Sequence, residues 1–175
     1  YLREKGLAKA AKKADRIAAE GICDTNVSAD NQIASIVEVN SETDFVAKNE
    51  KFRGYVAAVA AQAAKTNAAD IDAFLAEAWE LDPSKTVKEE LASQIAVIGE
   101  NMSIRRFDII DGSIGSYIHG GGSAGVVTKF DTDCDTSGAA FVEYAKNVCM
   151  QIAAMSPSYV DRDHVPASVK KKKKS

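Results

Sequence analysis

Residues 121–125, with the sequence GGSAG, have the G-x-S-x-G spacing of a serine nucleophile, and His164 follows as a triad base would follow its serine. In such hydrolases the serine lies on a sharp turn between a strand and a helix. Here strand-like residues stand on both sides of Ser123, and the glycines are typical of a hairpin turn. The pattern favours the hairpin and leaves a small serine hydrolase, using Ser123 and His164, as the alternative.

Three acidic residues, Asp131, Asp133 and Asp135, have the spacing of the first ligands of a calcium loop. Such a loop needs glycine at its sixth position and glutamate at its twelfth, where this sequence has Thr136 and Val142. A solvated acidic loop is the better interpretation. The chain has no phosphate-binding glycine motif, and its two histidines and three cysteines do not form a metal-ligand pattern. We therefore expect no cofactor, no metal and no enzymatic reaction.

Asp44 and Phe45 stand where a strand-like run passes into a helix. An acidic residue in the first turn is favoured by the helix dipole, and Ser41 or Thr43 could cap that turn. The phenyl ring of Phe45 either packs in the core or projects from the corner, where it would be a typical anchor for a partner protein. His119, before the glycine-rich turn, is either a hairpin end or a contact residue. Both alternatives stay open.

The elements that would position these residues alternate between helix and strand. Apolar spacing and turn residues predict helices at 7–20, from 41 or 43 to about 65, at 70–79, from 84 or 86 to 99, and at 138–154, and strands at 22–28, 32–39, 102–110, 114–119 and 125–130. Gly21 is expected to end the first helix, and residues 157–169 to be extended. The buried faces should consist of Phe52, Val56, Val59, Ala60 and Ala63, and of Val87, Leu91, Ile95 and Ile98. The fold class is α+β. A faint repeat of a strand–helix unit predicts two related small lobes, each with antiparallel strands packed against helices.

The charge is distributed unevenly along the chain. Residues 1–16 carry a net charge of +4, residues 170–174 carry +5, and the body between them carries −12. An acidic body argues against a nucleic-acid-binding protein. The lysine run predicts a solvated tail. The apolar runs are far shorter than the ~18 residues of a membrane span, so we expect no membrane contact. The three cysteines are odd in number and widely spaced, which fits reduced thiols in a cytosolic protein, so we expect a cytoplasmic location.

Residues 37–52, with the sequence VEVNSETDFVAKNEKF, resemble the elongation factor Ts family. Four further blocks resemble the family in the same order: KAAKKADRIAAEG at 9–21, AVIGENMSIRRF at 96–107, GSYIHGGGSAGVV at 115–127, and residues 151–169. The resemblance implies a guanine-nucleotide exchange factor that promotes the release of GDP from elongation factor Tu. The expected partner is Tu in its GDP-bound or its nucleotide-free state. A scaffold that binds Tu without catalysing exchange is the alternative within the same resemblance.

The resemblance assigns the partner contacts to Lys13, Asp44, Phe45, Ile98, Gly99 and His119. Phe45 would insert between helices of Tu near its magnesium and nucleotide site. The resemblance also divides the chain into a basic helical connector at 1–16 from an N-terminal module, a first core lobe at 17–111, a partial second lobe at 112–169 and a disordered lysine tail at 170–175. The resemblance thus predicts a core fragment of the family, and the sequence makes no prediction of its oligomeric state.

Overall fold

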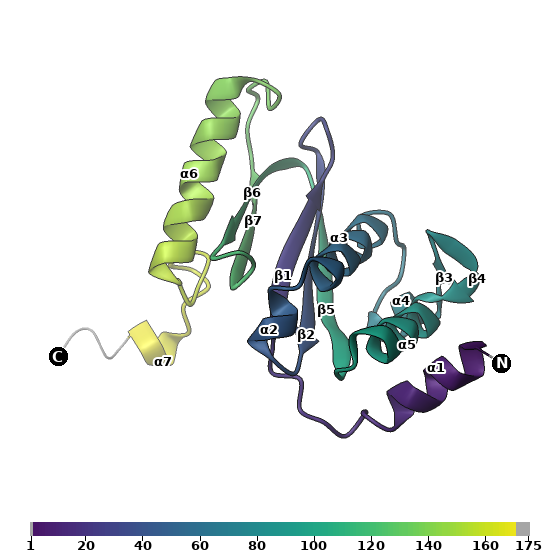
Figure 1. The fold of residues 1–175 in the computed structure, drawn as a ribbon. Coiled ribbons are helices and arrows are strands. Elements are labelled where there is room, and N and C mark those ends of the chain that lie inside the picture. Colours follow the sequence, from purple (N-terminus) through teal and green to yellow (C-terminus); the bar gives the residue numbers. More distant parts are fainter. Residues whose placement is uncertain (1, 171–175) are drawn as a thin grey trace.

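The computed structural model describes residues 2–170 and has the predicted α+β fold, with antiparallel strands packed against helices (Figure 1). Its helices are α1 (Leu2–Ala11), α2 (Asp44–Ala47), α3 (Glu50–Ala63), α4 (Ile71–Ala76), α5 (Val87–Ile98), α6 (Ala139–Met155) and α7 (Ala167–Lys170). Its strands are β1 (Glu20–Val27), β2 (Ile33–Ser41), β3 (Ala78–Trp79), β4 (Asp82–Thr86), β5 (Met102–Asp111), β6 (Ser113–His119) and β7 (Ala124–Phe130).

The central sheet has the strand order β1-β2-β5, and both pairings are antiparallel. Helix α3 packs on one face of this sheet, toward which Val37 and Val39 point. Alternate residues of a strand point to opposite faces. Cys23 and Ile36 accordingly lie on the other face, against Gly125 of the β6–β7 hairpin. Helix α6 covers the far side of that hairpin (Figure 1). The molecule is therefore layered, with the hairpin between the central sheet and α6.

The core lies between the central sheet and helices α3 and α5. The predicted α3 stripe is confirmed, because its five members are fully buried: Phe52, Val56, Val59, Ala60 and Ala63. In the α5 stripe Val87 and Ile95 are buried, whereas Leu91 and Ile98 are half-buried at its margin. Each fully buried valine or phenylalanine contributes about 1.5–3 kcal/mol to stability. This apolar layer fixes the directions of α3 and α5, on which the candidate site depends.

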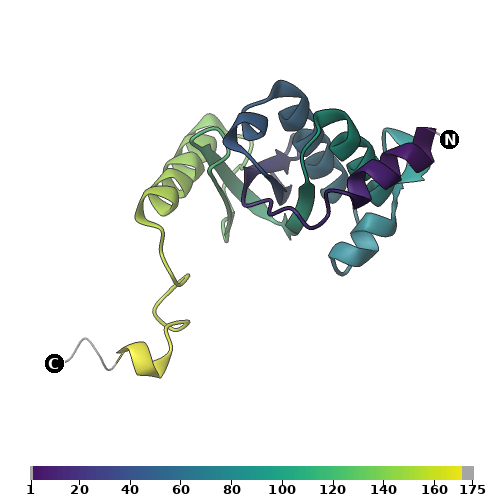
Figure 2. The ribbon, with the colours of Figure 1, turned by 60° about the horizontal axis from the view of Figure 1, so that its bottom comes forward.

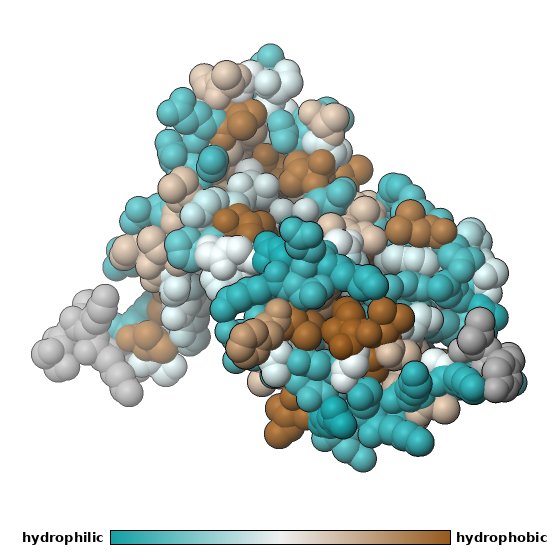
Figure 3. All heavy atoms as spheres, viewed as in Figure 1, coloured by the Kyte–Doolittle hydropathy of each residue, from teal (hydrophilic) through white to brown (hydrophobic). Residues whose placement is uncertain are grey.

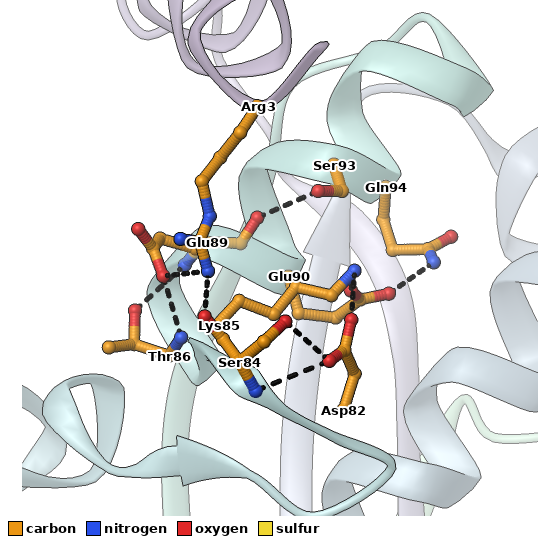
Figure 4. A network of polar contacts seen from close by, with 9 residues as sticks. All are labelled: Arg3, Asp82, Ser84, Lys85, Thr86, Glu89, Glu90, Ser93 and Gln94. Carbon is orange, nitrogen blue, oxygen red and sulfur yellow. Dashed lines mark hydrogen bonds and ion pairs between the residues drawn. The ribbon is translucent and has the colours of Figure 1, made fainter. Parts of the chain in front are cut away.

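A polar network joins α1 to the start of α5 (Figure 4). Arg3 of α1 forms an ion pair of 3.1 Å with Glu89. Glu89 also completes a capping box with Thr86, which begins α5 and is one of the two starts, Ser84 or Thr86, that the sequence predicts. Beside it, Lys85 lies 2.5 Å from the buried carboxylate of Glu90. The carboxylate of Glu89 thus both caps α5 and holds α1 against it.

The first helix differs from the prediction. It ends at Ala11, turns follow over 12–16, and Gly21 lies inside β1, paired with Asn40. Glu20 and Gly21, where the predicted helix would end, instead pair with Ser41 and Asn40 of β2. Gly21 has a φ of 134°, and a Cβ atom on it would lie 2.1 Å from the carbonyl oxygen of Val39. The glycine is required by this close approach rather than by a helix end.

The helix predicted to run to about residue 65 is two helices. The side chain of Asn49 accepts hydrogen bonds from the backbone N–H groups of Lys51 and Phe52, so it caps α3 as a new helix. Thr43 caps the preceding one-turn helix α2 through the N–H of Val46. Asparagine at a cap competes with continued helix, which is why the chain breaks there.

The helix predicted at 70–79 is also shorter, because α4 ends at Ala76. The next residues form β3, in which Ala78 pairs with Thr86 of β4. The amide side chain of Gln62 in α3 donates to the carbonyl oxygen of Ala78 and accepts from the N–H of Glu80. These bonds satisfy the backbone of a strand in a segment whose composition favours helix.

The C-terminal segment leaves the layered body after α6 and projects away from it (Figure 2). It is not extended throughout, because α7 forms at its end. Lys170 is the last residue of α7, and the rest of the lysine tail lies outside the described residues. The predicted lobe boundary falls at Gly112, between β5 and β6, and stays a prediction. Among the helices of residues 2–170, none combines the length and apolar character that a membrane crossing requires.

Candidate functional site

Phe45 lies in the one-turn helix α2 and is 82% exposed. The core alternative for this ring is therefore excluded, and the ring projects from the corner between β2 and α3. Two residues later Ala47 is buried, and it anchors α2 to the body. Hydrophobic residues gather on this face between the positions of α2 and α5 (Figure 3). A large exposed ring on an anchored corner is typical of a protein-binding site.

Asp44, directly before Phe45, is exposed and lies in the first turn of α2. Its carboxylate is 2.8 Å from the ammonium group of Lys48. The hydrogen bond from Lys48, and then its positive charge, hold the pKa of Asp44 below its ordinary value. Beside the phenyl ring the surface therefore presents an ionised carboxylate and an ammonium group.

Ile98 and Gly99 lie at the end of α5. Gly99 is the C-cap, with a φ of 93°, and its N–H donates a hydrogen bond of 2.9 Å to the carbonyl oxygen of Ile95. This left-handed conformation is the one that glycine adopts at helix ends without strain. Val97 is 63% exposed beside them. The end of α5 therefore offers apolar surface and an exposed backbone turn.

The structure brings the corner of α2 and the end of α5 together, although they are far apart in the sequence. The backbone N–H of Thr43 donates a hydrogen bond of 3.0 Å to the carboxylate of Glu100. Thr43 directly precedes Asp44, and Glu100 directly follows Gly99. The predicted contact residues of the two segments are thus neighbours on one surface.

His119 is exposed at the end of β6. Its Nδ1 lies 3.1 Å from the hydroxyl oxygen of Tyr117. The turn that follows is attached to α3, because the guanidinium of Arg53 donates to the carbonyl oxygen of Gly121. The turn is also attached to β1, where the N–H of Cys23 donates to Gly122. The hairpin that carries His119 is therefore fixed to the helix that follows Phe45.

Lys13 lies in the turns after α1 and is half-exposed. The carbonyl oxygens of Ala14 and Arg16 accept hydrogen bonds from the side chain of Asn101, so this segment reaches the end of α5 as well. The next residue, Ile17, is 83% exposed, and sequence reasoning missed it. An apolar residue in a stretch predicted to be helix gave no signal of exposure.

Ser123 and His164 do not form a catalytic pair. Ser123 lies in the turn between β6 and β7, with a strand rather than a helix after it, and its hydroxyl donates to the carbonyl oxygen of His119 at 3.1 Å. The Nδ1 of His164 instead lies 2.7 Å from the carboxylate of Asp161. A nucleophile elbow requires a strand–turn–helix geometry. The hairpin interpretation is the one that the structure supports.

In the acidic loop before α6, a carboxylate accepts hydrogen bonds from within the loop. The carboxylate of Asp135 accepts hydrogen bonds from the backbone N–H and hydroxyl of Ser137, which lower its pKa. Within residues 2–170, no group of three or more histidine, cysteine, aspartate or glutamate side chains is placed to hold a metal ion. The thiols of Cys23, Cys134 and Cys149 are free.

Comparison with known proteins agrees with the sequence resemblance. The family model for Elongation factor TS matches residues 42–175. The chain is 50% identical over 176 residues to Elongation factor Ts of Clostridium perfringens, covering 99% of this chain and 57% of that protein. It is 47% identical over 167 residues to Elongation factor Ts of Clostridium tetani, covering 94% of this chain and 54% of that protein. It is 46% identical over 181 residues to Elongation factor Ts of Trichlorobacter lovleyi, covering 99% of this chain and 58% of that protein. The chain thus spans somewhat more than half the length of these relatives, and it belongs to the elongation factor Ts family.

Proposed function

We propose that this chain acts in translation elongation as a guanine-nucleotide exchange factor, which binds elongation factor Tu and promotes the release of GDP. The observation that carries the proposal is the ring of Phe45, 82% exposed on a helix whose other end is anchored in the core. Membership of the elongation factor Ts family supports the identity of the partner. The proposed site of action is the cytoplasm, where translation takes place.

The phenyl ring of Phe45 supplies binding energy. Burying an exposed phenylalanine side chain in a partner gives about 1.5–3 kcal/mol. This energy accelerates GDP release only if the state of Tu that accepts the ring holds GDP more weakly. By thermodynamic reciprocity, GDP then weakens the binding of this chain by the same factor by which the chain weakens GDP. In this proposal Phe45 inserts near the magnesium and nucleotide site, and no bond is made or broken.

The other predicted residues extend this surface around the ring. Ile98 and Gly99 offer an apolar helix end, while Asp44 offers an ionised carboxylate to donors of the partner. His119 would contact the partner from the hairpin fixed to α3, and Lys13 from the segment after α1. All five are half-buried or exposed. Their positions around Phe45 fit one continuous docking face.

The test follows the release of a fluorescent GDP from bacterial elongation factor Tu by stopped flow, with and without this chain. We expect acceleration by the wild-type chain and its loss, by at least about tenfold, in Phe45→Ala, since the lost burial of about 1.4 kcal/mol or more corresponds to that factor. The matched control is Leu81→Ala, because Leu81 is also 74% exposed but lies at the β3–β4 turn.

Each contrary result has a distinct meaning. Binding without acceleration by the wild-type chain would favour the scaffold alternative. Equal acceleration by the wild type and Phe45→Ala would remove Phe45 from the site while leaving the exchange activity. Melting curves of both variants should match the wild type, because both side chains are exposed.

A further inference from the structure

Two glutamates link the corner of α2 to the end of α5, because the carboxylate of each accepts hydrogen bonds from the other segment. The carboxylate of Glu100 accepts from the backbone N–H groups of Glu42 at 3.1 Å and Thr43 at 3.0 Å, and from the hydroxyl of Thr43 at 2.6 Å. In return, the carboxylate of Glu42 accepts from the backbone N–H of Asn101 at 2.6 Å. We refer to Glu42 and Glu100, with these bonds, as the glutamate clasp.

The clasp acts on the cap of α2. The hydroxyl of Thr43 donates a hydrogen bond to Glu100, so the lone pairs of its oxygen are left to accept from the N–H of Val46. A helix of four residues has almost no stability of its own, and its start depends on that cap. Glu100 therefore orients the hydroxyl that begins the helix carrying Phe45.

The clasp also acts on the segment after α1. Arg16 lies 3.6 Å from the carboxylate of Glu42, and its carbonyl oxygen accepts a hydrogen bond of 2.7 Å from the side chain of Asn101. Lys13 and Ile17 belong to the same segment. Three stretches of chain that are distant in sequence thus meet at the two glutamates.

We propose that Glu100 is a positioning residue, which holds the Phe45 corner and the end of α5 as one preformed surface for the partner. The inference rests on the proposed function. Ordering a surface at the moment of binding lowers affinity, because only the ordered fraction of molecules is competent to bind. Four hydrogen bonds to carboxylate acceptors keep that fraction high before the partner arrives.

The test compares Glu100→Ala with Glu100→Gln. The amide of glutamine keeps an oxygen for the two backbone N–H groups, and its NH₂ group can donate to the hydroxyl of Thr43. Alanine removes all three bonds. For Glu100→Ala we expect a loss of about tenfold in apparent affinity for elongation factor Tu, with the exchange rate at saturation unchanged, and recovery to within about threefold in Glu100→Gln.

A second readout is amide hydrogen exchange at Glu42 and Thr43, which should be at least about tenfold faster in Glu100→Ala, in proportion to the affinity lost. The matched control is Glu89→Ala at the other end of α5 (Figure 4), where a glutamate also caps the helix. Its loss should lower the melting temperature without changing the affinity for Tu.

Fast amide exchange at Glu42 and Thr43 with unchanged affinity would overturn the positioning role. If Glu100→Ala does not fold, Thr43→Val decides instead. Valine keeps the shape of threonine but loses the hydroxyl, and therefore one of the three bonds to Glu100. A loss of affinity smaller than that expected for Glu100→Ala should follow, with recovery in Thr43→Ser, and unchanged affinity would overturn the positioning role. A wild-type chain that neither binds Tu nor accelerates GDP release would remove the proposed function. A fully active wild type with a fully active Glu100→Ala would remove only the positioning role.

Discussion

The guanidinium of Arg53 donates a hydrogen bond of 2.6 Å to the carbonyl oxygen of Gly121, and it thereby fastens the β6–β7 hairpin to α3. Arg53→Ala should leave the fold intact and loosen this turn, because the bond is exposed and worth about 1 kcal/mol. The amide of Cys23, which donates to Gly122, should then exchange its hydrogen about fivefold faster. Amides of the central strand β2 are the internal control. Unchanged exchange at Cys23 would mean that β1 alone holds the turn.

Gly99 and Gly54 form a matched pair, because a Cβ atom would meet nothing within 4 Å at either position. Gly99 has a φ of 93°, so Gly99→Ala should lower the free energy of unfolding by about 1–2 kcal/mol through backbone strain alone. Gly54 lies inside α3, where alanine should raise that free energy by about 0.5–1 kcal/mol. Urea denaturation of both variants measures the difference. Two changes of the same sign would contradict the assigned backbone conformations.

The hydroxyl of Tyr55 is buried and makes no hydrogen bond within the described part of the chain. Burial, and then the charge of Glu90, raise the pKa of this phenol. Tyr55→Phe should therefore preserve the free energy of unfolding or raise it by up to about 1 kcal/mol. Tyr117→Phe is the control, because that hydroxyl has His119 as a partner. Destabilisation by Tyr55→Phe alone would indicate an unseen partner for its hydroxyl.

Glu38 should make stability depend on pH in the acid range. Burial alone would raise the pKa of Glu38, but hydrogen bonds from Arg106 and Arg105 outweigh it and hold the pKa below its ordinary value of 4.5. A carboxyl group with a lowered folded-state pKa stabilises the protein above the unfolded-state pKa, and this contribution is lost as the pH falls through the folded-state pKa. Glu38→Gln should thus be less stable by about 1–2 kcal/mol at neutral pH, and the gap should close below about pH 4.5. A gap that does not change with pH would contradict this assignment.

The hydroxyl of Ser123 should have no enhanced nucleophilic reactivity. Its hydroxyl donates to the carbonyl oxygen of His119 rather than to a base, so a fluorophosphonate probe should not label the chain. Ser123→Ala should lower the free energy of unfolding by less than about 1 kcal/mol, the value of one exposed hydrogen bond. It should leave GDP release from Tu unchanged. Labelling that disappears in Ser123→Ala would restore the hydrolase alternative.

The sequence predicted the parts of this fold that local pattern determines. The buried stripe of α3 follows from apolar spacing. Ser84 and Thr86 were equal candidates for the start of α5, and the capping box with Glu89 decides for Thr86. The break at Asn49 was hidden, because apolar residues on both sides continue a helical spacing. Gly21 was misassigned, because its close approach to Val39 depends on a pairing between strands that composition does not reveal.

The sequence indicated which residues belong to the candidate site, but not that they are exposed or that they lie close together. The position of Phe45 at a corner was visible, but its exposure was not, since periodicity alone fits a core ring equally well. The resemblance to elongation factor Ts proposed Ile98 and Gly99 as contacts. Nothing in the sequence linked them to Phe45, because the bond from Thr43 to Glu100 joins residues that are 57 positions apart. Such distant pairings arise from packing and not from local spacing.

The close approach of Gly21 to the backbone of Val39 means that selection for folding and selection for partner binding would conserve different residues. A library of variants chosen only for folding would keep glycine at this position, because even one added carbon collides with the backbone of β2. The same library would accept almost any residue at position 45, where the ring contacts solvent. If Phe45 acts as proposed, a library chosen for exchange would keep both Gly21 and Phe45. Comparing the two sets of survivors would divide the chain, position by position, into residues that build the scaffold and residues that meet the partner.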